Sequence, residues 1–166
     1  TGWSTPIFDA SVLGANNVRV AMAARAPLAA SLTTTDIGGG VFQSTVQAYS
    51  SFGDGTPLFS TNLPTTGNVI AGAIGVSDDG TRIVAVVSNA SGQQHIRVFS
   101  AAGLSLASYD VPASANIRFG ATDAQANRLY LGLYNGTCEI YDLTTGVLQH
   151  SQSLGGTFES HALSAD

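Results

Sequence analysis

The residues whose side chains could carry chemistry are few and widely spaced. The chain of 166 residues has one cysteine, Cys138, and three histidines, His95, His150 and His161, and it contains no lysine. No two histidines stand at the spacing of a metal-binding pair. The Gly-x-Ser-x-Gly, His-Glu-x-x-His, paired-cysteine, Walker and Gly-x-Gly-x-x-Gly motifs are all absent. Without lysine the chain cannot form a Schiff base. We therefore predict no catalytic residue, no cofactor and no metal site within this chain.

The aspartates and the cysteine have positions that favour structural roles. Cys138 falls in the middle of an expected strand, which favours a small buried group over a reactive or intermolecular thiol. The aspartates of the turns lack the alternating spacing of a calcium loop, so we expect them to accept hydrogen bonds from turn backbone. They are Asp54, Asp78, Asp79 and Asp123.

The elements that position these residues are short strands separated by turns. Residues 128–134 are aliphatic and aromatic, and Asn135-Gly136 follows at once, which predicts a type I′ hairpin. Residues 137–141 return as the partner strand, residues 142–146 form a second turn, and residues 147–154 form a third strand. The segment before Asp123 supplies a fourth. One four-stranded sheet buries too little apolar surface to offset its ordering entropy, so it must pack against copies of itself.

Copies of this unit are present in the sequence. Residues 77–87 match residues 122–133, with Arg82 and Arg128 46 residues apart, and Ile96–Phe99 matches Cys138–Tyr141 at a distance of 42 residues. A more divergent copy precedes them, in residues 17–22, 46–49, 54–55 and 58–63. Four short strands repeated at this period are typical of a β-propeller.

Two stretches carry a family resemblance. Ser77-Asp78-Asp79-Gly80 resembles the turn after the innermost strand of WD-repeat β-propellers, and residues 141–146 (YDLTTG) resemble their third strand and following turn. Tyr141 or Phe99 stands where the family has Trp, and the Gly-His dipeptide is missing. The resemblance implies an all-β fold, a partial β-propeller of four-stranded antiparallel blades. It transfers no activity, because propellers host unrelated functions.

The repeat predicts one propeller segment over residues 1–166. Its parts are blade one at 6–63 with an inserted surface loop at 25–40, blade two at 68–111, blade three at 116–154 and the start of blade four at 157–166. In blade one we expect residues 6–13 as the innermost strand and residues 18–24 as the second. Glu159 and His161 then fall on an innermost strand and face the central channel.

Three blades and one strand do not close a ring, since propellers need four to eight blades. We therefore expect other protein chains, or the remainder of a longer chain, to complete it. Small Ala and Gly residues in 68–76 suit the crowded propeller axis, and the apolar run 83–87 suits a strand covered on both faces.

The charge and composition of the chain restrict the classes of partner that it can bind. The net charge is −5, the pI is about 4.8, and the six basic residues are scattered arginines, so no nucleic-acid footprint is present. No apolar run of membrane-spanning length occurs, so we expect no membrane span. Two sequons begin at Asn89 and Asn135, both in expected hairpin turns. They are either chance occurrences or glycan acceptors of a secreted glycoprotein. The low charge, the absence of lysine and the content of Ser, Thr and Asn favour an extracellular or secreted location over a cytosolic one.

The sequence therefore predicts a non-enzymatic scaffold that contacts proteins or glycans, chiefly through residues 25–40. The alternative is the propeller portion of a secreted enzyme with its catalytic residues outside this chain. Residues 140–146 also resemble the blade motif of quinone-dependent dehydrogenases, although His150 stands where that family has Trp and the cofactor residues are not recognisable.

Overall fold

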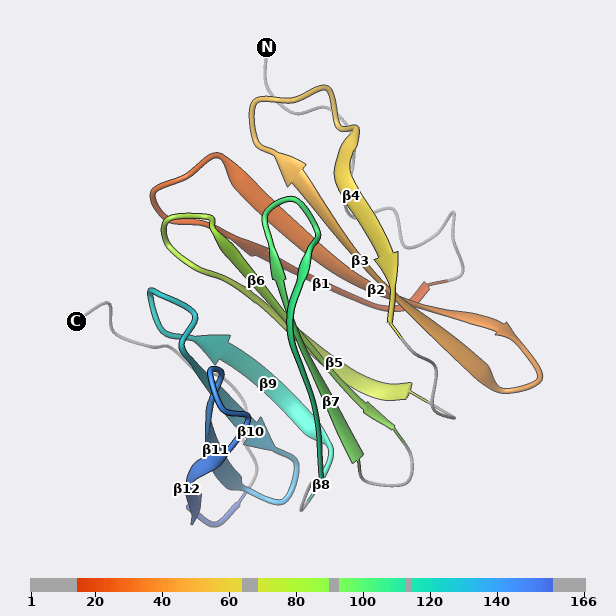
Figure 1. Ribbon diagram of the computed structural model, residues 1–166. Helices are drawn as coiled ribbons and strands as arrows, with labels where there is room; N and C mark the ends of the chain where they lie inside the picture. The colour runs from red at the N-terminus through yellow and green to blue at the C-terminus, as the bar shows by residue number, and fades with distance from the viewer. Residues whose placement is uncertain (1–14, 64–68, 90–92, 113–114, 157–166) are drawn as a thin grey trace.

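The fold consists of three separate sheets placed side by side. The computed structural model describes residues 15–63, 69–89, 93–112 and 115–156. These residues form twelve strands and no helix, arranged as three four-stranded antiparallel sheets (Figure 1). The predicted all-β partial β-propeller of four-stranded blades is confirmed.

Within each blade the strands follow one another in space as they do in the chain. Blade one contains β1 (Ala15–Met22), β2 (Leu28–Gly38), β3 (Val41–Ser50) and β4 (Pro57–Asn62). Blade two contains β5 (Val69–Val76), β6 (Arg82–Asn89), β7 (Gln93–Ser100) and β8 (Ser105–Pro112). Blade three contains β9 (Ile117–Thr122), β10 (Arg128–Leu133), β11 (Thr137–Asp142) and β12 (Leu148–Ser153).

The first strands of the three blades, β1, β5 and β9, lie next to one another and form the inner edge of the fan (Figure 1). Small residues permit this approach. A Cβ on Gly120 of β9 would stand 2.5 Å from Cβ of Ala73 on β5, and one on Gly72 would stand 2.8 Å from a methyl of Leu32. The predicted crowding of small residues at the axis is thus present, because a larger side chain at Gly120 would push β9 away from β5.

Blade two is covered on both faces, as its apolar second strand predicts. Alternate residues of β6 enter two different cores. Ile83, Ala85 and Val87 pack against Leu28, Ala30, Leu32 and Val46 of blade one. Val84 and Val86 pack with Ile96 and Val98 against Leu129, Leu131, Leu133 and Tyr141 of blade three. The continuous apolar pattern of β6 therefore reflects burial between two neighbours.

Backbone hydrogen bonds connect the turns that follow the innermost strands. The N–H of Arg25 donates to the carbonyl of Asp78 at 2.8 Å, and the N–H of Asp78 donates to the carbonyl of Ala124 at 2.7 Å. Asp78 and Ala124 each stand two residues after the end of their innermost strand and Arg25 stands three residues after its own, so a similar bond is made at both blade interfaces. The blades are thereby fixed in register along the axis as well as packed face to face.

Residues 25–40 are not the predicted loop. Only a short turn precedes β2, which begins at Leu28 and pairs with β3 along its whole length. The run Thr33-Thr34-Thr35 is β-branched and suits a strand, and the hydroxyls of Thr34 and Ser44 form a buried hydrogen bond of 2.9 Å. The three glycines at 38–40 have positive φ and form the end of a hairpin. Pro27 lies just before the strand, where no ladder hydrogen bond is required of it.

The strand assignment of blade one shifts as a result. Residues 18–22 belong to the innermost strand β1, so the prediction of 18–24 as the second strand is wrong. The predicted strand at 6–13 lies outside the described residues, as do the predicted start of blade four and the two channel residues Glu159 and His161.

The Asn135-Gly136 turn is also different from the prediction. Among the described non-glycine residues only Ala126 has positive φ, so Asn135 does not adopt the type I′ conformation. Gly136 has a φ of 76°, and its N–H donates to the carbonyl of Leu133 at 3.0 Å. The hairpin therefore has a three-residue loop, with a type I turn followed by a left-handed glycine.

Candidate functional site: the open face, the axis and the polar network

Blade three presents one face to blade two and leaves the other open. The open face of blade three consists of Phe119, Ala121, Tyr130, Cys138 and Ile140, which alternate with the residues of the core shared with blade two. All five are partly buried. Within the described part of the chain no element packs against this face. Among the described residues it is therefore an apolar sheet surface on which no element packs.

The open face repeats the packing positions of blade two. Ile96 and Val98 on β7 lie against blade three, and Cys138 and Ile140 occupy the same places on β11. The ring of Phe119 lies over Gly132, where a Cβ would stand 2.0 Å from Cε1 of the ring. The ring thus occupies the space that a side chain at position 132 would fill. The face has the chemistry of a blade interface.

The opposite end of the stack is more polar. On the outward side of blade one, Thr33, Thr45, Gln47 and Tyr49 alternate with the core residues of β2 and β3. The hydroxyl of Tyr49 donates to Oε1 of Gln47 at 2.9 Å. Hydroxyl and amide groups are compatible with contact with solvent. The outward face of blade one is therefore polar, and the outward face of blade three is the apolar one.

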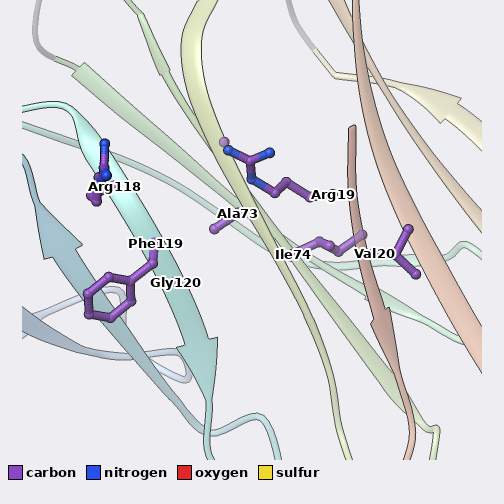
Figure 2. A pocket seen from close by; sticks show the side chains of 8 residues that line it. Arg19, Val20, Ala73, Ile74, Arg118, Phe119 and Gly120 are labelled. Atoms are coloured by element: carbon purple, nitrogen blue, oxygen red, sulfur yellow. The ribbon is translucent and has the colours of Figure 1, made fainter. Parts of the chain in front are cut away.

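Two arginines lie at the inner edge of the fan. The three innermost strands enclose a hollow of about 340 Å³ (Figure 2). Arg19 of β1 and Arg118 of β9 line it together with Val20, residues 72–74, Phe119 and Gly120. The sequence presents these arginines as scattered charges. One feature of the sequence connects the two arginines. Each is a charged residue among the apolar and small residues of an innermost strand.

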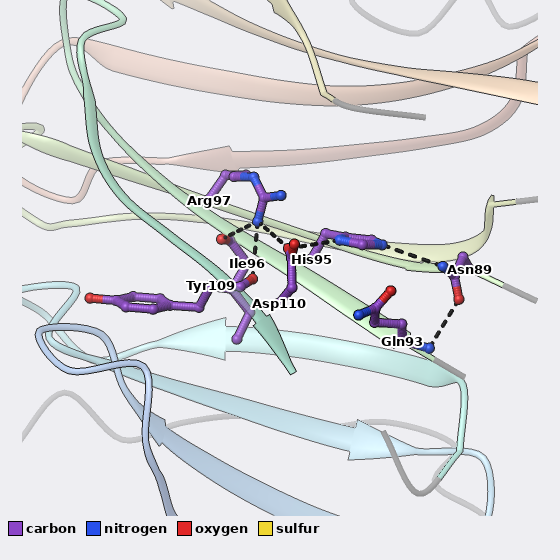
Figure 3. Close-up of polar contacts among 7 residues, drawn as sticks. All are labelled: Asn89, Gln93, His95, Ile96, Arg97, Tyr109 and Asp110. Carbon is purple, nitrogen blue, oxygen red and sulfur yellow. Dashed lines mark hydrogen bonds and ion pairs between the residues drawn. The ribbon is translucent and has the colours of Figure 1, made fainter. Parts of the chain in front are cut away.

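A polar network on blade two was not foreseen from the sequence. Nδ1 of His95 donates to Oδ1 of Asp110 at 2.8 Å, and Nη1 of Arg97 donates to the same oxygen at 2.8 Å (Figure 3). His95 is only 2% exposed, and its Nε2 lies 3.4 Å from Nδ2 of Asn89. Arg97 also donates to the carbonyl of Tyr109 at 3.0 Å. Asp110 follows His95 by fifteen positions, and the register of the hairpin makes the two residues partners.

This network ties β7 to β8 through one carboxylate. Burial raises the pKa of Asp110, but the hydrogen bonds and charges of His95 and Arg97 outweigh burial and hold that pKa below its ordinary value. His95 is enclosed and no nucleophile accompanies it in the network, so the arrangement is suited to holding two strands together. It accounts for the histidine without a catalytic role.

Asp54, Asp79 and Asp123 act as predicted for the turn aspartates. Oδ1 of Asp79 accepts from the hydroxyl of Ser77 and from the N–H and hydroxyl of Thr81. These bonds lower the pKa of Asp79 to about 2. Asp54 and Asp123 likewise accept backbone N–H groups of their own turns. In the described residues no three His, Cys, Asp or Glu side chains gather closely enough to hold a metal ion.

The two sequons differ in accessibility. Asn135 is exposed, and its Oδ1 accepts from the N–H of Thr137 at 3.1 Å. Asn89 is 3% exposed and its Oδ1 accepts from the N–H of Gln93 at 3.0 Å. A glycan needs the asparagine side chain in solvent, so the folded chain disfavours Asn89 and leaves Asn135 as the candidate. Of the remaining candidates, His150 is exposed on β12 and Cys138 is partly buried.

None of the described residues forms a helix of the length and apolarity needed to cross a bilayer. Burial, and secondly the charge of Glu139, raise the pKa of Cys138, so its thiol is less reactive than an ordinary one.

Comparison with known proteins bears on the fold. No family model matches the chain, and no curated protein matches it. Among solved structures it is similar to one described as "Crystal structure of HIRA(644-1017)", with a TM-score of 0.54 and 16% identity over 84% of this chain and 42% of that one. The chain thus spans less than half of that structure. At this identity the likeness concerns the fold alone, and it agrees with the three blades described above: the chain has the architecture of a partial β-propeller.

Proposed function

We propose that this chain is a non-enzymatic binding and scaffolding module whose main contact surface is the open face of blade three. The occupant of that face is a further four-stranded propeller blade. The observation that supports this is the repeat of the interface, in which Cys138 and Ile140 stand where Ile96 and Val98 meet blade three.

The occupant is inferred from the interface that already exists. Blade three covers blade two with Leu129, Leu131 and Leu133 of its second strand. A blade with aliphatic residues at those positions would cover Tyr130 and Ile140 in the same manner. At about 25 cal/mol for each Å² of apolar surface removed from water, covering such a face favours association.

The proposed blade belongs either to another protein chain or to the remainder of a longer chain. Both sources present the same surface chemistry, and the mass of the native species distinguishes them. A species heavier than the 16.9 kDa of this chain indicates that separate chains supply the blade. A longer parent polypeptide with the same face protected indicates the second source.

The test uses Ile140→Glu, with Leu106→Glu as the matched control. Leu106 is an exposed aliphatic residue on the outer strand β8, so the control adds the same charge outside the open face. We expect light scattering to give a mass above that of one chain for the unchanged protein and for Leu106→Glu, and the mass of one chain for Ile140→Glu. Cys138 should react with a thiol reagent only after Ile140→Glu has opened the face. A monomer that is stable, soluble and unchanged by Ile140→Glu contradicts the proposal.

We further propose an extracellular location. The support is the absence of lysine, the low charge and the exposed sequon at Asn135. Expression in a eukaryotic secretory host, followed by mass measurement of the secreted chain, tests it.

A further inference from the structure

The hollow at the inner edge of the fan combines residues from all three blades. β1 contributes Arg19 and Val20, β5 contributes Gly72, Ala73 and Ile74, and β9 contributes Arg118, Phe119 and Gly120. Its volume of about 340 Å³ falls in the range of small-molecule sites. Because three separate blades build it, the hollow exists only when the blades are packed in their observed order.

The charge of the hollow is opposite to that of the protein. The chain carries a net charge of −5, and only six of its residues are basic. Two of those six line the hollow, and none of its lining residues is Asp or Glu. Two like charges facing one concave site repel each other unless an anion lies between them. The electrostatic arrangement therefore favours a negatively charged occupant.

The two guanidinium groups approach the hollow from opposite sides. Figure 2 shows Arg19 extending from β1 across β5, towards the side on which Arg118 projects from β9. The floor between them is built from Gly72, Ala73 and Gly120, whose small size lets the innermost strands pack closely beneath the hollow. Both arginines line the hollow that contains this floor.

Local contacts hold each arginine in place. Nη1 of Arg118 donates to the hydroxyl of Tyr134 at 3.2 Å, and its Cζ lies 5.0 Å from the centre of the Tyr134 ring. Nη1 of Arg19 donates to the carbonyl of Val18 at 3.2 Å. A guanidinium has five N–H donors, so these contacts are compatible with further donation to an anion. Arginines held in this way lose less entropy when a ligand binds.

We propose that this hollow is a binding site for a small oxyanion, a carboxylate or phosphate group, held between Arg19 and Arg118. The planar fork of a guanidinium matches the oxygens of both groups and forms charge-assisted hydrogen bonds with them. The size of the hollow admits a small metabolite that carries such a group, and its apolar wall at Val20 and Ile74 suits a short carbon skeleton. The proposal does not depend on what covers the open face of blade three.

The test measures binding of inorganic phosphate and of citrate to the full chain by calorimetry at low ionic strength, with sodium chloride of equal ionic strength as the reference. We expect saturable binding of at least one of the two probes. Arg19→Gln and Arg118→Gln should each weaken it about tenfold or more, as expected for the loss of a hydrogen bond between charged groups. Phosphate and citrate titrated separately show which oxyanion the site prefers.

Arg128→Gln is the matched control, because Arg128 is an exposed arginine on β10 and its loss changes the net charge equally. Its affinity for the probe should equal that of the unchanged chain. A second measurement does not depend on the variants and applies if they fail to fold. In NMR spectra of the unchanged chain, the signals of the Arg19 and Arg118 side-chain N–H groups should shift with added probe, while the signal of Arg128 should not. Absence of saturable binding, or binding that all three variants weaken equally, overturns the proposal.

Discussion

Gly146 lies directly against the ring of Tyr109, so closely that a Cβ on Gly146 would stand 2.2 Å from Cδ1 of that ring. One blade earlier the same relationship joins Gly103 to Phe59, at 2.6 Å from Cγ. In both cases an aromatic residue of an outer strand packs on the glycine of the next blade's outermost turn. The hydroxyl of Tyr109 also donates to the carbonyl of Leu143 at 3.2 Å. Neighbouring blades are therefore joined at their outer edges as well as at the axis.

We predict that Gly146→Ala lowers the free energy of unfolding by about 2–4 kcal/mol. About 1 kcal/mol comes from the positive φ of 73°, and the remainder from overpacking against Tyr109. Gly155→Ala is the control, since Gly155 has a φ of 72° and no atom within 4 Å of its Cβ position. Urea unfolding measures both. Equal losses in the two variants would show that the ring contact contributes nothing.

The buried amide of Gln94 predicts a stabilising substitution. Gln94 is 0% exposed, and neither of its amide atoms has a protein hydrogen-bond partner in the described part of the chain. Gln94→Leu should raise the free energy of unfolding by about 1–2 kcal/mol, because it removes two unsatisfied polar atoms. The exposed neighbour Gln93 provides the control, since Gln93→Leu should change stability by less than about 0.5 kcal/mol. A less stable Gln94→Leu variant would refute the idea that this amide costs free energy.

Asp110 should make stability depend on pH. Its pKa in the folded chain lies below the ordinary 3.8, so its contribution is complete above that value and is lost as the pH falls through the folded pKa. Asp110→Asn should cost about 1 kcal/mol at pH 6, since the carboxylate is half exposed, and the cost should shrink at lower pH. Unfolding curves recorded from pH 6 to pH 3 measure this. Ser108→Ala, on the exposed side of the same strand, should give a difference that does not change with pH.

The carboxyl of Asp79 should titrate near pH 2. The hydroxyl of Ser77 lowers its pKa most, followed by the backbone N–H and the hydroxyl of Thr81. Carbon NMR of the carboxyl measures the titration directly. Ser77→Ala should move the midpoint towards 3.8, and Thr81→Val should move it less because the backbone bond remains. The contribution of this turn to stability is present above pH 3.8 and is lost as the pH falls through about 2.

A secreted form of the chain should carry its glycan at Asn135 only. Asn135→Gln should remove the mass of one glycan from the folded secreted protein, while Asn89→Gln should leave the mass of the glycans unchanged. The reason is the 3% exposure of Asn89 against the exposed loop position of Asn135. Peptide mapping of the secreted fraction locates the modification. A glycan found on Asn89 of folded protein would contradict the burial argument.

The three blades could be predicted from the sequence because each one repeats the same pattern of short apolar strands and turns. The alternation of β6 between two cores follows directly from its run of aliphatic residues. The loop predicted at 25–40 is instead largely a strand, because Pro27 and three glycines are compatible with tight turns as well as with a loop, and only pairing with β3 distinguishes the two. The Asn-Gly turn differs because loop length, which depends on the strand register, decides the turn type.

The candidate sites were harder to predict because they depend on distances between blades. Arg19 and Arg118 are 99 positions apart in the sequence and meet one hollow only because β1, β5 and β9 lie side by side. His95 and Asp110 are joined by a hairpin whose register includes a bulge next to Phe99. The repeated sequence pattern of a blade therefore does not predict the hollow with its two arginines or the contact between His95 and Asp110.

The hydrogen bonds between the turns have a direction, from the N–H of Arg25 to Asp78 and from the N–H of Asp78 to Ala124. The turn at Asp78 thus gives a donor to the blade after it and an acceptor to the blade before it. Two copies related by a two-fold axis through their blade-three faces would bring donor against donor at Ala124, while copies added in one sense of rotation would match donor to acceptor. The hydrogen bonds of the main chain therefore favour the addition of further blades in one sense of rotation about the axis, whatever side chains the added blade carries.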